Sequence, residues 1–131
     1  MQSVPYACLF IAFLLIYVPR FFVARAQAQD PKGYDNRHPR AQQATLTGLG
    51  IRAVGAHNNS FEAFAPFAAG VLVCMQTGVA KDTVPLLCIA FVALRGLYIA
   101  LYLGDKAIAR SSVWTLGFLV CCTLLVLPLL G

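Results

Sequence analysis

Four long apolar runs divide this 131-residue chain and leave few folds open to it. The predicted spans cover about residues 4–24, 44–77, 84–103 and 112–130, and a helix needs about 20 residues to cross a bilayer. Apolar residues make up 60% of the chain and charged residues 11%, whereas soluble domains carry about 25% charged residues. We therefore predict an all-α membrane protein, a four-transmembrane-helix bundle that forms one domain over residues 1–131.

The net charge of +5 does not indicate a nucleic-acid partner. Four of the ten basic residues gather in one connecting segment, residues 25–43, and the basic residues do not form a stripe with interleaved aromatic residues on a polar face. The five cysteines lie inside apolar runs without the spacing of a metal site, so no metal is expected and we interpret them as small buried apolar residues: Cys8, Cys74, Cys88, Cys121 and Cys122.

Lysine and arginine are distributed unevenly among the connections. Only Lys81 lies between the second and third spans, whereas the connections before the second and fourth spans carry Arg20, Arg25, Lys32, Arg37, Arg40, Lys106 and Arg110. The positive-inside rule then predicts that both termini lie outside the cytoplasm. The short connections favour a multi-pass protein of a bacterial inner membrane.

Ala24–Ala28 resembles the small-residue cleavage site of a secretory signal. The start of the chain, Met1–Pro5, lacks the basic region that such signals carry, and the apolar run continues past Pro19 and Arg20. We therefore expect the first run to remain as a membrane span.

Charged residues on the second span point to a specific role. At 100° per residue, Asn59 lies about 20° and Glu62 about 80° from Arg52 around a helix, so the three share one arc. This arc cannot face lipid, since a bare charge there costs several kcal/mol. His57 and Asn58 fall off the arc, and we expect them to make a contact between helices or at an interface rather than to bind a ligand.

The third span carries a matching stripe. Arg95, Tyr98 and Tyr102 recur at spacings of three and four, and Arg110 stands at the start of the fourth span. One interpretation is an internal clamp, in which Arg52 or Arg95 pairs with Glu62. The other follows from the excess of arginine over acid, which favours an anionic guest, because guanidinium groups bind carboxylates through paired hydrogen bonds.

The residues of this region carry a resemblance to a known family. The stretch from Arg52 to Glu62 resembles the signature of the MAPEG superfamily, the membrane-associated proteins in eicosanoid and glutathione metabolism. The Asn36–Arg40 segment, the stripe of Arg95, Tyr98 and Tyr102, and Arg110 are also similar to features of that family. The resemblance covers essentially the whole chain in length and four-span layout.

The resemblance implies a homotrimer that holds glutathione between subunits near the cytoplasmic face. It implies a glutathione-binding set of Arg52, Asn59, Glu62, Arg95, Tyr98 and Tyr102. Arg110 is the candidate catalytic residue, because a cation next to a thiol of pKa about 8.5 favours the nucleophilic thiolate. The eicosanoid synthases have a second arginine where this chain has Gly55 and often an aromatic hydroxyl where it has Ala63, so the chain looks closer to the family's bacterial branch.

Two functions follow as hypotheses. The first is a glutathione transferase or peroxidase that acts on lipophilic small molecules dissolved in the bilayer. The second is a non-catalytic membrane scaffold or accessory subunit of a larger membrane complex, in which the polar arc joins helices to one another.

Overall fold

The computed structural model describes residues 3–130 and consists there of helices joined by short connections. The ends of the predicted domain, residues 1–2 and 131, lie outside this range. The helices are α1 (Ser3–Ala28), α2 (Pro39–Ala44), α3 (Gly48–Thr77), α4 (Thr83–Leu103) and α5 (Ala107–Leu130). All but the short α2 are long and apolar enough to cross a membrane, which confirms the predicted all-α, four-span architecture.

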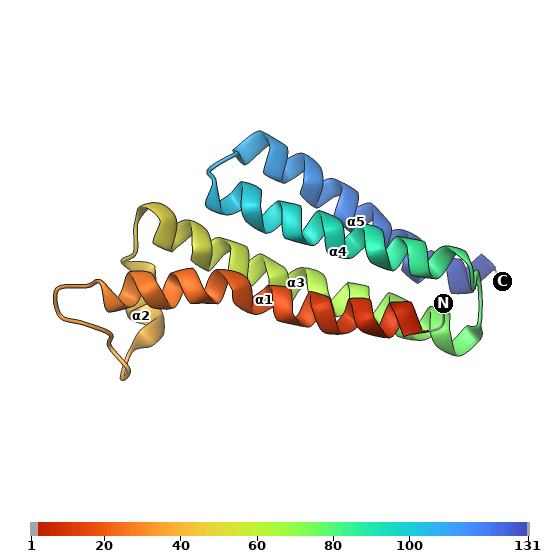
Figure 1. The fold of residues 1–131 in the computed structure, drawn as a ribbon, viewed down its shortest axis with the longest axis horizontal. Coiled ribbons are helices and arrows are strands. Elements are labelled where there is room, and N and C mark those ends of the chain that lie inside the picture. The colour runs from red at the N-terminus through yellow and green to blue at the C-terminus, as the bar shows by residue number, and fades with distance from the viewer. Residues whose placement is uncertain (1–2, 131) are drawn as a thin grey trace.

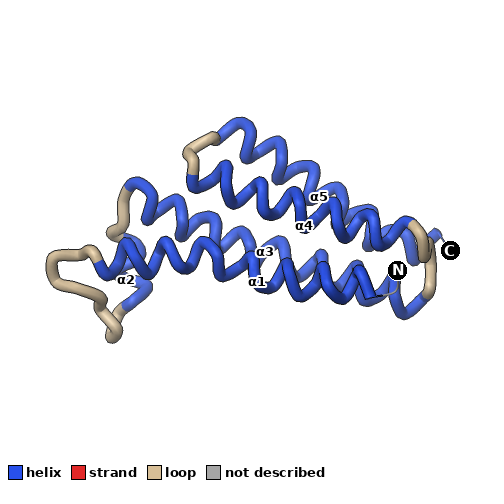
Figure 2. Tube along the Cα trace, in the orientation of Figure 1, coloured by secondary structure: helices blue, strands red, loops and turns tan. Residues whose placement is uncertain are grey.

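The four long helices form two antiparallel pairs laid against each other (Figure 1). The helix α1 packs along α3, and α4 packs along α5, while α3 also contacts both helices of the second pair. The start of α1 and the end of α5 lie at one end of the bundle, and α2 lies at the other (Figure 1). Figure 2 shows that the longest non-helical connection leads from α1 to α2 at that second end.

The core lies where the two pairs meet. Phe67 of α3 stacks on Phe91 of α4 with ring centroids 3.9 Å apart, and both side chains are fully buried. A Cβ at Gly70 would lie 2.8 Å from the Leu124 Cβ, so α3 and α5 can approach this closely only because residue 70 is glycine. Small residues of this kind let membrane helices pack on backbone contacts.

The fourth span begins earlier than the sequence predicts. The predicted span starts at residue 112, whereas α5 already starts at Ala107. A tight turn explains the difference: Asp105 adopts φ of +60°, and the Lys106 N–H donates to the Leu101 carbonyl at 2.9 Å. Arg110 therefore lies in the first turns of a helix, which fixes the direction of its side chain.

The second span begins later than predicted, at Gly48, after the separate helix α2. The backbone is extended at Thr47, and Gly48, the first residue of α3, takes φ of +54°, so the right-handed helix of α2 cannot continue through these two residues. The helix expected from residue 44 is thus broken in two. The first span also continues four residues past its predicted end at residue 24, to Ala28.

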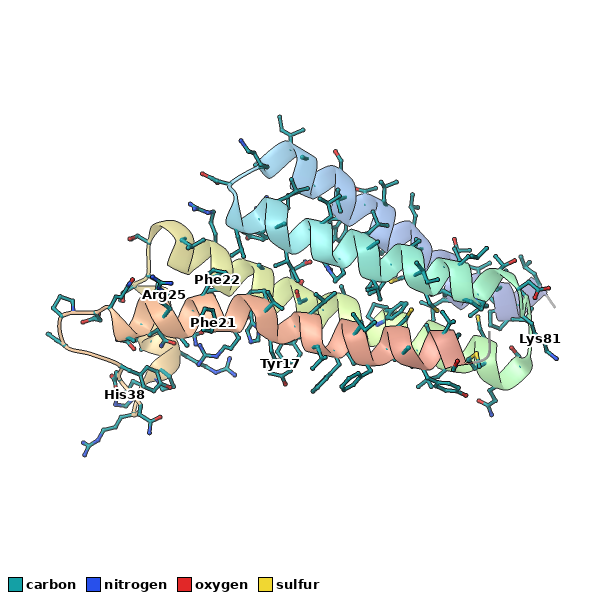
Figure 3. The ribbon with its side chains drawn as sticks, in the orientation of Figure 1. Tyr17, Phe21, Phe22, Arg25, His38 and Lys81 are labelled. Atoms are coloured by element: carbon teal, nitrogen blue, oxygen red, sulfur yellow. The ribbon has the colours of Figure 1, made fainter. Side chains whose placement is uncertain are left out.

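The connection before α3 is anchored by a buried glutamine. Gln27 is fully buried, its Nε2 donates to the Pro39 carbonyl at 3.0 Å, and its Oε1 accepts from Arg20 at 3.1 Å. Gln42 extends the network by donating to the Gly33 carbonyl at 2.8 Å. Figure 3 shows Arg25 and His38 at this end of the bundle and Lys81 at the opposite end.

We expect Gln27→Leu to loosen this connection while leaving the spans intact. The substitution leaves the Pro39 carbonyl without its donor, at a cost of about 1–3 kcal/mol. Hydrogen–deuterium exchange should become faster between residues 29 and 44 and stay unchanged in α4. Gln43→Leu is the matched control, and equal exchange in the two variants would contradict the anchoring role.

The same connection contains a carboxylate-capped turn. The Asp35 Oδ1 accepts the backbone N–H groups of Arg37 and His38 at 2.9 and 3.0 Å. These N–H groups, that of His38 foremost, hold the pKa of the Asp35 carboxyl below its usual range. The basic segment therefore has a defined backbone course just before Pro39, the first residue of α2.

Candidate functional site

Arg95 is the centre of the polar cluster on the inner face of the bundle. Its side chain is 6% exposed and its Nη2 donates to the Asn59 Oδ1 at 3.1 Å, which links α4 to α3. The Asn59 Nδ2 donates in turn to the Glu62 Oε2 at 3.2 Å. Among residues 3–130 no acidic side chain forms an ion pair with Arg95, and its Nε has no hydrogen-bond partner.

Two tyrosines continue the cluster toward the start of α5. The Arg95 guanidinium lies 4.0 Å from the centroid of the Tyr98 ring, and Tyr98 meets Tyr102 edge to face at 5.7 Å. The guanidinium of Arg110 lies 4.3 Å from the Tyr102 ring centroid. We call these four side chains the Arg–Tyr ladder. Each cation sits on an aromatic face, which is a favourable contact but does not neutralise its charge.

Arg52 is placed differently from the rest of the predicted set. Its Nε donates to the Leu103 carbonyl at 3.1 Å, and its Nη1 lies 3.8 Å from the Asp105 carboxylate. The clamp interpretation of the sequence pairs Arg52 or Arg95 with Glu62, and in the described part of the chain neither ion pair forms. Because Asp105 already balances Arg52, the uncompensated positive charge belongs to Arg95 and Arg110.

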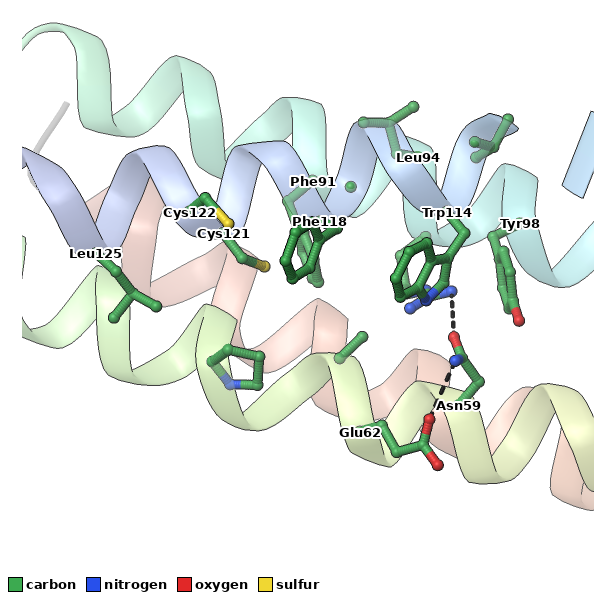
Figure 4. Close-up of a pocket in the computed structure, with 15 residues that line it drawn as sticks. Asn59, Glu62, Phe91, Leu94, Tyr98, Trp114, Phe118, Cys121, Cys122 and Leu125 are labelled. Atoms are coloured by element: carbon green, nitrogen blue, oxygen red, sulfur yellow. Dashed lines mark hydrogen bonds between the residues drawn. The ribbon is translucent and has the colours of Figure 1, made fainter. Parts of the chain in front are cut away.

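An apolar cavity of about 240 Å³ opens beside Arg95, between α3, α4 and α5. Asn59, Glu62 and Tyr98 lie with Arg95 at its polar end. Figure 4 shows the side chains of Trp114 and Phe118 projecting from α5 toward α3, which carries Asn59 and Glu62. The apolar walls are Ala63, Pro66, Phe91, Leu94, Val113, Trp114, Gly117, Phe118, Cys121, Cys122 and Leu125. Arg110 and Tyr102 line a shallower hollow that shares Asn59, Tyr98 and Trp114 with this cavity.

The structure thus brings together six of the seven predicted site residues around two adjoining hollows and leaves Arg52 outside both linings. The sequence reading missed Trp114 and Phe118, which stack at 5.4 Å. Their spacing of four after Arg110 and after each other was the available signal, since residues four apart share a helix face. It also missed Asp105, which lies in the turn and not on a span.

His57 makes the inter-helix contact that was predicted for it. Its Nδ1 lies 2.7 Å from the Ile16 carbonyl of α1, so Nδ1 carries the proton, and its ring packs against Phe61 at 5.1 Å. No group of three or more His, Cys, Asp and Glu within residues 3–130 is placed to hold a metal ion. The two hollows are lined by cations, hydroxyls, an amide and one carboxylate, together with the thiols of Cys121 and Cys122.

These features define a class: an integral, multi-pass membrane protein whose helical bundle holds buried cationic side chains at the end of an apolar cavity. The chain belongs to the MAPEG family, whose sequence profile matches residues 4–130, and this confirms the resemblance seen in the sequence. That family includes glutathione transferases and peroxidases as well as non-catalytic members. No curated protein and no solved structure matches the chain.

Proposed function

We propose that the protein is a glutathione-dependent transferase or peroxidase that acts on lipophilic electrophiles within the bilayer. Arg95 is the observation that carries the proposal: its guanidinium is 6% exposed, and among residues 3–130 it has no acidic partner and its Nε has no hydrogen-bond partner, at the polar end of an apolar cavity. Burying a lone arginine at membrane depth costs several kcal/mol. A bound anion would supply the counter-charge that no acidic side chain among residues 3–130 supplies to Arg95, and family membership makes glutathione the leading candidate.

The side chains match the groups of glutathione one by one. One of its carboxylates suits the guanidinium of Arg95, whereas Arg52 lies outside both hollows and would bind the other carboxylate only by exchanging Asp105 for the ligand. Its amino group suits the exposed carboxylate of Glu62, oriented by Asn59. The hydroxyls of Tyr98 and Tyr102 supply further donors.

In this proposal Arg110 interacts with the thiol group of glutathione. A cation beside the sulfur stabilises the thiolate, which is the reactive form of the thiol at neutral pH. In conjugation the sulfur attacks an electrophilic carbon, the S–C bond forms, and the leaving group departs with the bonding electrons. With a hydroperoxide the sulfur takes the outer oxygen, the O–O bond breaks, and an alcohol leaves after protonation. A second glutathione then reduces the sulfenic acid to the disulfide and water.

The apolar walls of the cavity form the proposed binding surface for the second, lipophilic substrate. Phe91, Trp114 and Phe118 form a surface without charge that continues directly from the polar end. A lipophilic molecule that enters from the bilayer would place its reactive atom toward the Arg–Tyr ladder. Holding both reactants in this geometry is itself a major source of rate enhancement.

The proposal extends to a homotrimer in a bacterial inner membrane, with the basic end of the bundle in the cytoplasm. Glu62 supports an intersubunit site, because this polar side chain lies on the exposed surface of a helix that crosses the membrane. The last turn of α1 and the connection from it to α3 carry Arg25, Lys32, Arg37 and Arg40, whereas the connection at the opposite end carries only Lys81 (Figure 3), and this excess of lysine and arginine supports the orientation.

Thermal unfolding of the detergent-solubilised protein with glutathione tests the proposal. Glutathione at about a hundredfold excess over its dissociation constant should stabilise the wild-type protein by about 2.7 kcal/mol. Asn59→Ala should remove this stabilisation, because it breaks the link between Arg95 and Glu62. Asn58→Ala is the matched control, since Asn58 is the exposed neighbour on the same helix and has no part in the link.

Two outcomes would contradict the proposal. One is a wild-type protein whose unfolding temperature does not respond to millimolar glutathione. The other is an Asn59→Ala variant that loses its oligomeric state in size-exclusion chromatography without any ligand. That second result would favour the scaffold function, in which the polar cluster joins helices to one another.

A further inference from the structure

Gly55 forms a notch in α3 directly opposite Tyr102 of α4. A Cβ built on residue 55 would overlap the Tyr102 hydroxyl oxygen and lie 2.7 Å from its Cζ. The tip of the tyrosine therefore occupies space that only glycine leaves free. Glycine weakens a helix interior relative to alanine, so a glycine one turn after Arg52 calls for a reason of this kind.

Tyr102 connects this notch to the rest of the ladder. Its ring carries the Arg110 guanidinium at 4.3 Å and meets the edge of Tyr98 at 5.7 Å. Both contacts depend on where the ring plane lies. If the ring leaves the notch, the surface on which Arg110 rests moves with it.

We infer that Gly55 is a positioning residue. By leaving room for the Tyr102 ring, it fixes the place of the Arg110 side chain in the shallower hollow. The consequence for thiol activation rests on the proposed function, whereas the placement of Arg110 does not. Gly55 of α3 thus influences the position of Arg110 on α5 indirectly, because Tyr102 of α4 contacts both residues.

Gly55→Ala can test this because the variant should still fold. The atoms that the new methyl group meets are the far end of the Tyr102 side chain and not backbone, so the ring can swing away. Alanine is also the stronger helix former. Gly96→Ala is the matched control, since Gly96 lies inside α4 and a Cβ there meets nothing within 4 Å.

The first measurement needs no ligand. In a protein labelled with ¹⁵N-arginine, the Nε–H proton of Arg110 should resonate upfield because of the ring current of Tyr102, with the signal assigned by its loss in Arg110→Lys. The upfield shift should persist in Gly96→Ala. It should collapse in Gly55→Ala to the position found in Tyr102→Leu. A signal that stays upfield in Gly55→Ala overturns the inference.

The second measurement follows the ultraviolet absorbance of glutathione thiolate against pH. The pH at which half of the bound thiol is ionised should rise in Gly55→Ala by about one unit, because the cation has moved away from the sulfur. In a Tyr102→Leu background, Gly55→Ala should add nothing further, since the two residues act as one unit.

The two measurements separate the inference from the proposed function. A wild-type protein that binds no thiolate refutes the proposed function, and the Arg110 resonance still decides the role of Gly55. A resonance that moves while the thiolate titration stays unchanged overturns the catalytic consequence of the inference.

Discussion

Arg95→Met should abolish the stabilisation by glutathione and barely change the stability of the unliganded protein. At membrane depth an arginine costs about 2.5–3.5 kcal/mol. Its hydrogen bond to Asn59 stabilises the folded protein by about 1.5–3 kcal/mol, and its contact with the Tyr98 ring stabilises it by about 0.5–2 kcal/mol. These contributions nearly cancel, so the unliganded variant should differ from wild type by less than about 1.5 kcal/mol, whereas the ligand loses its buried cation.

Thermal unfolding of wild type, Arg95→Met and Arg95→Lys, each with and without glutathione, checks this expectation. Arg95→Lys keeps the charge but loses the planar pair of donors, so it should retain only part of the ligand response. The clamp hypothesis predicts the reverse pattern. If Arg95 holds the bundle together, its removal should destabilise the unliganded protein by about 3–5 kcal/mol, as loss of a buried ionic partner does.

The spans were predictable from sequence because a bilayer leaves the backbone few alternatives. A membrane-spanning segment must satisfy its own hydrogen bonds, so hydropathy and length define a helix such as α4 closely, predicted from residue 84 and observed from residue 83. The ends of helices depend on backbone turns instead. The reversal at Asp105, with φ of +60°, takes so few residues that a polar stretch read as loop is mostly helix.

The site was predictable within each helix and not between helices. Helical periodicity alone places Asn59 beside Glu62, three residues apart. It cannot show that Arg95 meets Asn59, because that contact depends on how far α4 is shifted along α3. The pairing of Arg52 with Asp105 was missed for the same reason, since the partner belongs to a turn whose path the periodicity does not describe.

The role of Gly55 can be recognised only in the three-dimensional structure and not in the sequence. In sequence, Gly55 is a position where this chain lacks an arginine found in the eicosanoid synthases. In the structure, the same position is occupied by the tip of Tyr102, so a side chain there would have to displace the ring. The glycine therefore belongs to a different arrangement of the site, in which an aromatic ring lies where a second arginine would need room.

The largest kinetic effect is expected for Arg110→Ala. Turnover of a lipophilic electrophile at pH 7 should fall about 8- to 30-fold, because an adjacent cation lowers the pKa of an acid by about 1–3 units and its loss returns the thiol toward about 8.5. The loss should therefore depend on pH: the rate of the variant should approach that of wild type as the pH rises above the ordinary thiol pKa. The affinity for glutathione should change little, since Arg95 and Glu62 remain.

The pH profile separates this role from a merely structural one. Lys106→Ala is the matched control, because Lys106 is an exposed cation one turn earlier that lines neither hollow, and its removal should leave the profile in place. A rate deficit of Arg110→Ala that stays constant from neutral to alkaline pH would contradict thiolate stabilisation. It would mean that Arg110 acts on binding or on the packing of Tyr102, because only an effect on ionisation disappears once the thiol ionises without help.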